Sequence, residues 1–118
     1  MNEPAAIEQS DFDTLLELLD ARTMRDVVRL FTASVPGRLE SLRAGIASGD
    51  GAAVATLFHT MRSGSGQLGA RRLEALCAHA EKQAKTGDLS AASDQLQQVH
   101  AEFERCLAWF DARGWLSA

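Results

Sequence analysis

The chain has little of what marks membrane or nucleic-acid-binding proteins. Its 118 residues include no Tyr and only two Pro and two Cys, and aromatic residues make up 6%. The longest stretch without a charged residue runs from Gly51 to Met61, and a bilayer span needs about 18 apolar residues. Acidic residues outnumber basic ones by 16 to 12. We therefore expect neither a membrane anchor nor a basic surface for nucleic acid.

The N-terminus and the cysteines favour a cytoplasmic protein. Met1 to Pro4 lack the basic start and the apolar core of a signal peptide. Cys77 and Cys106 lie far apart in apolar surroundings, which favours two reduced core cysteines over a disulfide framework. Small proteins are the expected partners of such an acidic chain.

Helical periodicity covers almost the whole chain. Strand signals are nearly absent, because β-branched residues are sparse and no segment alternates apolar and polar residues. Ser10 is the expected N-cap of a first short helix. Four longer amphipathic helices follow, with apolar stripes over residues 24–46, 54–68, 73–84 and 92–110. In the first of these, Pro36 and Gly37 predict a kink or local unwinding.

Four amphipathic helices with short connections pack most simply as an antiparallel up-down bundle, with the short N-terminal helix at one end. The predicted fold is therefore all-α. We find no linker, repeat or low-complexity tract that divides the chain. A single domain over residues 1–118 is expected, with residues 1–9 as a flexible tail.

One stretch, residues 59–70, fits a plain bundle poorly. It holds Gly64, Gly66 and Gly69, and glycine in a helix interior costs about 1 kcal/mol relative to Ala. The three match the dinucleotide pattern GxGxxG, but no strand precedes them, and the Lys and Ser or Thr of a P-loop are missing. Propensity alone predicts a loop over 63–66. The alternative is a helix to about Gln67, whose buried face would hold Val54, Leu57, Phe58, Met61, Ser65 and Leu68.

On that helix His59 lies beside the buried face among small residues. Positions four before, four after and seven after it are small, so the imidazole stands clear of its helix. Arg62 lies on the same side and can pair with an anion that the imidazole holds. We expect a partner to approach closely over this surface, whose small residues are Ala55, Ser63, Gly64 and Gly66.

Glu81 is predicted to lie level with His59 on the next helix. If the chain reverses at a turn near residues 68–70, the residue opposite position 59 on the following helix is at about position 80. A carboxylate there could accept the Nδ1 proton and leave Nε2 as a free nucleophile. Plainer interpretations stay open. Glu81 could be only the surface partner of Lys85 four residues on, and His59 a surface histidine without function.

The segment from His59 to Leu73 resembles the signature of histidine-containing phosphotransfer (HPt) domains. That signature is His, one residue, an aliphatic, Lys or Arg, Gly, two small residues, two further residues, an aliphatic, Gly, a small residue, two more residues and then Leu. The matching residues are His59, Met61, Arg62, Ser63, Gly64, Ser65, Leu68, Gly69, Ala70 and Leu73. Two departures stand out: Ser63 replaces the usual Gly, and Arg62 the commoner Lys.

The resemblance implies a role for each site residue. His59 would be the phospho-acceptor, Arg62 would support the phosphoryl group, and Glu81 would orient the imidazole, as in the chemotaxis-kinase version of the domain. It implies a four-helix bundle that works as a monomeric phosphocarrier without a cofactor, not as an enzyme. A receiver domain of a response regulator or hybrid histidine kinase would supply Mg²⁺ and the acidic pocket.

Other functions also fit an all-α chain. The first alternative is a non-catalytic helical bundle used for binding alone, such as an inactive HPt-like or dimerisation domain. A zinc site of His59, His79 and His100 lacks the spacing of ligand pairs. A bundle that binds a small molecule or a metal needs inward-facing polar ligands, and the stripes above are too apolar for that.

Overall fold

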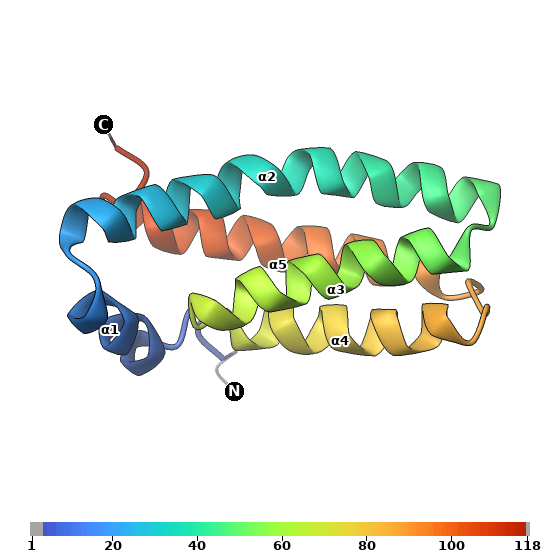
Figure 1. Cartoon of the computed structure of the whole chain (residues 1–118), viewed down its shortest axis with the longest axis horizontal. Coiled ribbons are helices and arrows are strands. Elements are labelled where there is room, and N and C mark those ends of the chain that lie inside the picture. Colours follow the sequence, from blue (N-terminus) through green and yellow to red (C-terminus); the bar gives the residue numbers. More distant parts are fainter. Residues whose placement is uncertain (1–3, 118) are drawn as a thin grey trace.

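Five helices and no strand make up the part of the chain that the computed structural model describes, residues 4–117. They are α1 (Gln9–Leu18), α2 (Ala21–Ser48), α3 (Gly51–Gln67), α4 (Arg71–Lys85) and α5 (Ala92–Ala112). Helices α2 to α5 lie side by side in alternating directions, and α1 lies at the end where α2 begins (Figure 1). The prediction of an all-α up-down bundle with a short N-terminal helix is confirmed.

The apolar stripes of the four long helices meet in one core. Each helix contributes residues that are almost fully buried, among them Val28, Phe58, Leu73 and Phe103. Removal of this apolar surface from water is the main force that holds the bundle together. Both cysteines are free and buried in this core, as predicted. None of the helices of residues 4–117 combines the length and apolar content that a membrane span requires.

Residues before α1 close the turn between α3 and α4. The backbone amide of Glu8 donates to the carbonyl of Gly69 at 2.7 Å, and Gly69 has a φ of 82°. A Cβ there would lie 2.9 Å from the carbonyl oxygen of Glu8 and from Cβ of Asp11. Only glycine combines this left-handed backbone with so close an approach. The turn that reverses the chain after α3 is therefore sealed by the N-terminal segment.

The flexible tail predicted over residues 1–9 is wrong where the structure describes it. Ala6 and Ile7 are buried against the core, and α1 already begins at Gln9. These two apolar residues lie outside any periodic pattern, and their burial together with the hydrogen bond from Glu8 to Gly69 anchors the segment. Residues 1–3 lie outside the described residues.

The predicted N-cap of the first helix, Ser10, is also wrong. Ser10 lies inside α1, and its hydroxyl donates to the carboxylate of Glu8 at 3.0 Å.

Helix α2 continues unbroken through Pro36 and Gly37, so of the predicted kink or local unwinding the unwinding does not occur. Both residues are exposed. On a solvent-facing side the helix can tolerate a missing amide donor, because water can satisfy the freed carbonyl and helices bend outward on that side. The apolar stripe of α2 is uninterrupted from Met24 to Leu42.

Candidate functional site

The glycine-rich stretch is helical, so the loop interpretation is wrong and the helix to Gln67 is confirmed. The side that α3 turns to the core is buried, including Phe58, Met61 and Ser65. The hydroxyl of Ser65 donates to the carbonyl of Met61 at 2.6 Å, which satisfies a polar group inside the core. Tertiary packing thus outweighs the poor helix propensity of the glycines.

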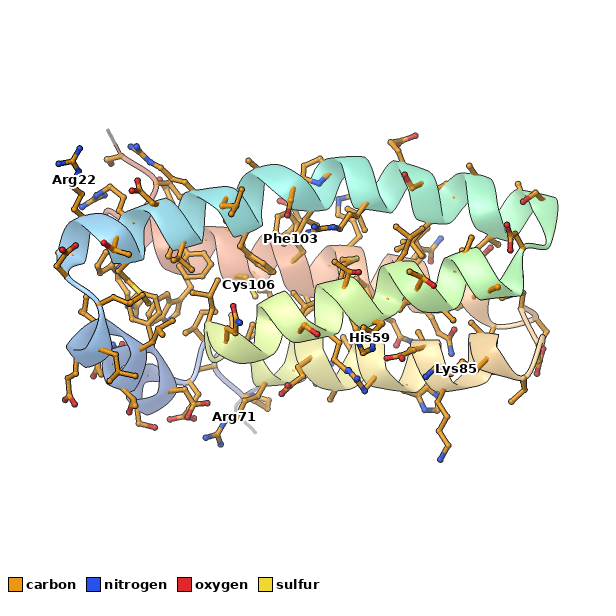
Figure 2. The ribbon with its side chains drawn as sticks, in the orientation of Figure 1. Arg22, His59, Arg71, Lys85, Phe103 and Cys106 are labelled. Carbon is orange, nitrogen blue, oxygen red and sulfur yellow. The ribbon has the colours of Figure 1, made fainter. Side chains whose placement is uncertain are left out.

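His59 projects from α3 toward α4, with 53% of its side chain exposed (Figure 2). Its Nδ1 lies 3.0 Å from Oε2 of Glu81 on α4. Glu81 is only 3% exposed, because α3 and α4 pack closely along this edge of the bundle. The prediction that His59 and Glu81 lie level with each other is confirmed.

Two cations complete the cluster around Glu81. Arg62 places Nη1 at 3.4 Å from Oε1 of Glu81 and Nη2 at 3.1 Å from Nδ1 of His59. Lys85 places Nζ at 3.0 Å from Oε2. The pair with Lys85 and the contact with His59 therefore coexist, although residue spacing alone presents them as alternatives.

The charges around Glu81 decide its protonation. Burial alone raises the pKa of this carboxyl, but hydrogen bonds from Lys85 and His59 and the charge of Arg62 outweigh burial and hold the pKa below 4.5. The carboxylate is therefore ionised at neutral pH and can only accept hydrogen bonds. Oε1 has no hydrogen bond among the described residues, although Arg62 lies within ion-pair distance.

This electrostatic arrangement assigns the tautomer of His59. An ionised carboxylate at Nδ1 requires the proton on that nitrogen, which leaves the lone pair on Nε2. The guanidinium of Arg62 can only donate, so it pairs with the carboxylate and not with a protonated Nδ1. The cluster can thus present one unprotonated imidazole nitrogen next to a fixed positive charge.

Of the small residues predicted around His59, Ala55 and Ser63 lie beside the histidine, whereas the two glycines face other helices. Ala55 lines a shallow groove of about 160 Å³ beside His59, together with Thr56, Glu81 and Lys85. Ser63 is exposed, and its hydroxyl donates to the carbonyl of His59 at 3.2 Å.

The two glycines face neighbouring helices. A Cβ at Gly64 would lie 3.1 Å from the ring of Phe31 on α2, and one at Gly66 would lie 2.3 Å from the carboxylate of Glu74 on α4. Packing inside the bundle therefore accounts for Gly64, which faces a ring, whereas Gly66 faces only the end of a flexible side chain. Their contact with a partner stays a proposal.

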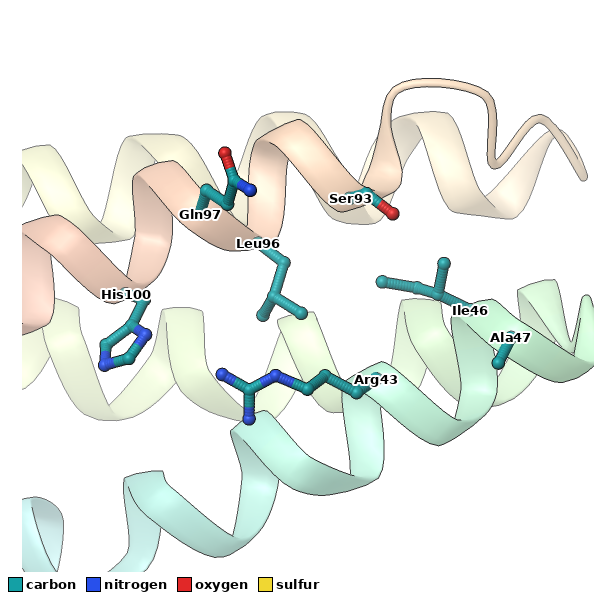
Figure 3. A pocket seen from close by; sticks show the side chains of 7 residues that line it. All are labelled: Arg43, Ile46, Ala47, Ser93, Leu96, Gln97 and His100. Atoms are coloured by element: carbon teal, nitrogen blue, oxygen red, sulfur yellow. The ribbon is translucent and has the colours of Figure 1, made fainter.

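The other histidines lie apart from this cluster. His79 is exposed on α4. His100 pairs with Glu104 at 3.4 Å and borders a groove of about 430 Å³ between α2 and α5 (Figure 3). Within residues 4–117 no three side chains of His, Cys, Asp or Glu come together as metal ligands.

Comparison with known proteins identifies the class. The family model described as Hpt domain matches residues 26–109, and the chain belongs to this family. Its role is histidine phosphotransfer in phosphorelay signalling. Hpt proteins are phosphocarriers and not ordinary enzymes, and Hpt domains interact with receiver domains.

The fold matches a solved structure, the histidine-containing phosphotransfer protein B (HptB) from Pseudomonas aeruginosa PAO1. The TM-score is 0.88 at 24% sequence identity, and the match covers 94% of this chain and 96% of that one. A search of curated protein sequences found no match.

Proposed function

We propose that His59 is the phospho-accepting residue and that its Nε2 is the nucleophile. The observation that carries this proposal is the contact of Nδ1 with the buried carboxylate of Glu81. It fixes the ring from one side and leaves the other side half exposed. In this proposal Glu81 orients the imidazole and Arg62 supports the phosphoryl group.

The transfer step uses these atoms directly. The lone pair of Nε2 forms a bond to phosphorus while the bond to the aspartate oxygen of a phosphorylated receiver breaks, and the aspartate leaves with that electron pair. Nδ1 keeps its proton, so the ring acquires a positive charge. That charge lies 3.0 Å from Oε2 of Glu81. Phosphoryl transfer depends chiefly on positioning and charge stabilisation, which a rigid helix with one presented nucleophile can supply.

A receiver domain would dock over α3 and the neighbouring part of α2. Leu30 on α2 is 73% exposed, which is unusual for a large apolar side chain. It borders a groove of about 320 Å³ between α2 and α3 with Phe31 and Gly64. Ala55 and Ser63 lie on either side of His59 along α3, so their small side chains leave room for a partner's backbone.

The finer points of the carrier role are also proposals. The receiver would supply Mg²⁺ and the acidic pocket, and the domain would act as a monomer without a cofactor in the cytoplasm. The acidic composition and the absence of a nucleotide-binding motif from the sequence support this division of labour.

Labelling by phosphorylated receivers tests the proposal. A panel of receiver domains, charged with radiolabelled acetyl phosphate, is mixed with the wild-type domain, with His59→Gln and with the matched control His100→Gln. We expect acid-labile, base-stable label on the wild type and on His100→Gln, and none on His59→Gln with an unchanged circular dichroism spectrum. Equal label on His59→Gln contradicts the proposal, and receiver binding without label on the wild type indicates a binding-only bundle.

A further inference from the structure

Lys85 and His59 share one oxygen atom of Glu81. Nζ of Lys85 and Nδ1 of His59 each lie 3.0 Å from Oε2, so the two nitrogens are no farther apart than twice that distance. The residues come from facing helices (Figure 2), and both line the groove of about 160 Å³ beside the ring. The ammonium group and the imidazole therefore border the same open groove.

The charges of the cluster are unbalanced before phosphorylation. Two permanent cations, Arg62 and Lys85, face the single carboxylate of Glu81. A phosphoryl group carries between one and two negative charges at neutral pH and three acceptor oxygens. Its arrival beside the ring would bring the cluster close to neutrality, so the surplus cation has a natural counter-ion only in the phosphorylated state.

Lys85 is better suited than Arg62 to follow the new charge. Its side chain is 66% exposed, against 38% for Arg62, whose guanidinium pairs with Oε1 of Glu81 at 3.4 Å and lies close to the ring of His59. An ammonium on a flexible four-carbon stem can change partners, whereas a planar guanidinium keeps a fixed geometry. Arg62 therefore remains with Glu81 while Lys85 can move.

We propose that Lys85 is a second phosphoryl-contacting residue, whose ammonium moves from Oε2 of Glu81 to the phosphoryl oxygens on His59. The move leaves Oε2 to the Nδ1 proton alone, which holds the charged ring of phosphohistidine more firmly. This inference rests on the proposed role of His59. In this role Lys85 stabilises the phosphorylated state of His59, which its ion pair with Glu81 alone would not do.

A purely structural role for Lys85 makes a different prediction. Glu81 and Lys85 are four residues apart on α4, and pairs at this spacing whose ammonium is exposed add little to helix stability. Their loss would change neither the rate at which His59 is phosphorylated nor the lifetime of the product. The two roles therefore separate in phosphorylation kinetics and not in folding.

Phosphoramidate provides a test without any partner protein. In this reaction the bond from phosphorus to Nε2 forms as the phosphorus–nitrogen bond of phosphoramidate breaks, and ammonia leaves. Phosphorylation rate and phosphohistidine lifetime are measured for wild type, Lys85→Gln and Lys85→Arg. The control is Lys82→Gln, which removes the same charge from an exposed position on the same helix outside the groove.

We expect Lys85→Gln to shorten the lifetime or slow the phosphorylation by about threefold to tenfold. Lys85→Arg should recover most of the loss, and high salt should shrink the difference because the group is exposed. Lys82→Gln should match the wild type. Equal behaviour of Lys85→Gln and Lys82→Gln overturns the inference while the role of His59 stands. Label that persists in His59→Gln overturns the proposed function and this inference together.

Discussion

Gly66 on α3 packs directly against the carboxylate of Glu74 on α4, and a Cβ at position 66 would lie 2.3 Å from Oε2. Because that oxygen ends a flexible side chain, the carboxylate can move away at small cost. Gly64 faces a different neighbour, the ring of Phe31, which is buried and packs edge-on against Phe103. The neighbour of Gly66 can therefore move to make room for a Cβ, whereas the neighbour of Gly64 is held in place by packing.

This difference predicts opposite effects of two substitutions. Gly66→Ala gains helix propensity and should stabilise the fold by up to about 1 kcal/mol. Gly64→Ala gains the same propensity but displaces a packed ring, so it should be neutral or destabilising by up to about 1 kcal/mol. Urea denaturation of both variants measures the difference. A Gly64→Ala variant more stable than Gly66→Ala would show that the packing around Phe31 is not the constraint.

Substitutions of Glu81 separate orientation from charge. Glu81→Gln keeps an acceptor for the Nδ1 proton but removes the charge that binds Arg62 and Lys85, whereas Glu81→Ala removes both. The phosphorylation rate of His59 should therefore fall in the order wild type, Gln, Ala, with a loss of about tenfold or more for Ala. Stopped reactions with phosphoramidate measure the rates. Equal rates for all three proteins would mean that Glu81 does not orient the ring.

The lowered pKa of Glu81 predicts a pH dependence of stability. A carboxyl whose pKa is lower in the folded than in the unfolded state stabilises the fold above its ordinary value of 4.5, and this contribution disappears as the pH falls through the lower folded value. The difference in unfolding free energy between wild type and Glu81→Gln should shift against the wild type as the pH falls below about 4.5. Other acidic groups are common to both proteins and cancel. A difference that is the same at pH 7 and at pH 3 would contradict this account.

The buried cysteines should be inert in the folded protein. Burial raises the pKa of both Cys77 and Cys106 to about 12, so almost no thiolate forms at pH 8 and the thiols are also inaccessible. Iodoacetamide should label neither thiol in buffer and both in concentrated urea, as mass spectrometry can show. Rapid labelling of either residue in buffer would mean that the core opens more readily than its packing indicates.

The sequence predicted the central contact of the site because that contact depends on helix period and turn position alone. His59 and Glu81 are related by one reversal of the chain, and the apolar pattern locates both helices around it. The membership of Lys85 in the same cluster was not predicted. Spacing shows that Glu81 can pair with Lys85 or with His59, but only coordinates show that one buried carboxylate holds both.

Other features depend on neighbours that are distant in the sequence. The close approach of Gly66 to Glu74 involves a second helix, and the burial of Ile7 involves a core that no local pattern reveals. No unwinding occurs at Pro36 because this residue is exposed, so water can satisfy the carbonyl that proline leaves without a donor. The sequence pattern alone does not show that exposure.

The bond between phosphorus and His59 is the most direct test of the central claim. The domain is labelled with ¹⁵N, phosphorylated, and examined by NMR for the coupling of ³¹P to the imidazole nitrogens. Because Nδ1 lies against Glu81 at 3.0 Å, we predict a coupling to Nε2 of His59 and to no other nitrogen. Phosphorus bound to Nδ1 of His59, or to His79 or His100, would contradict the account.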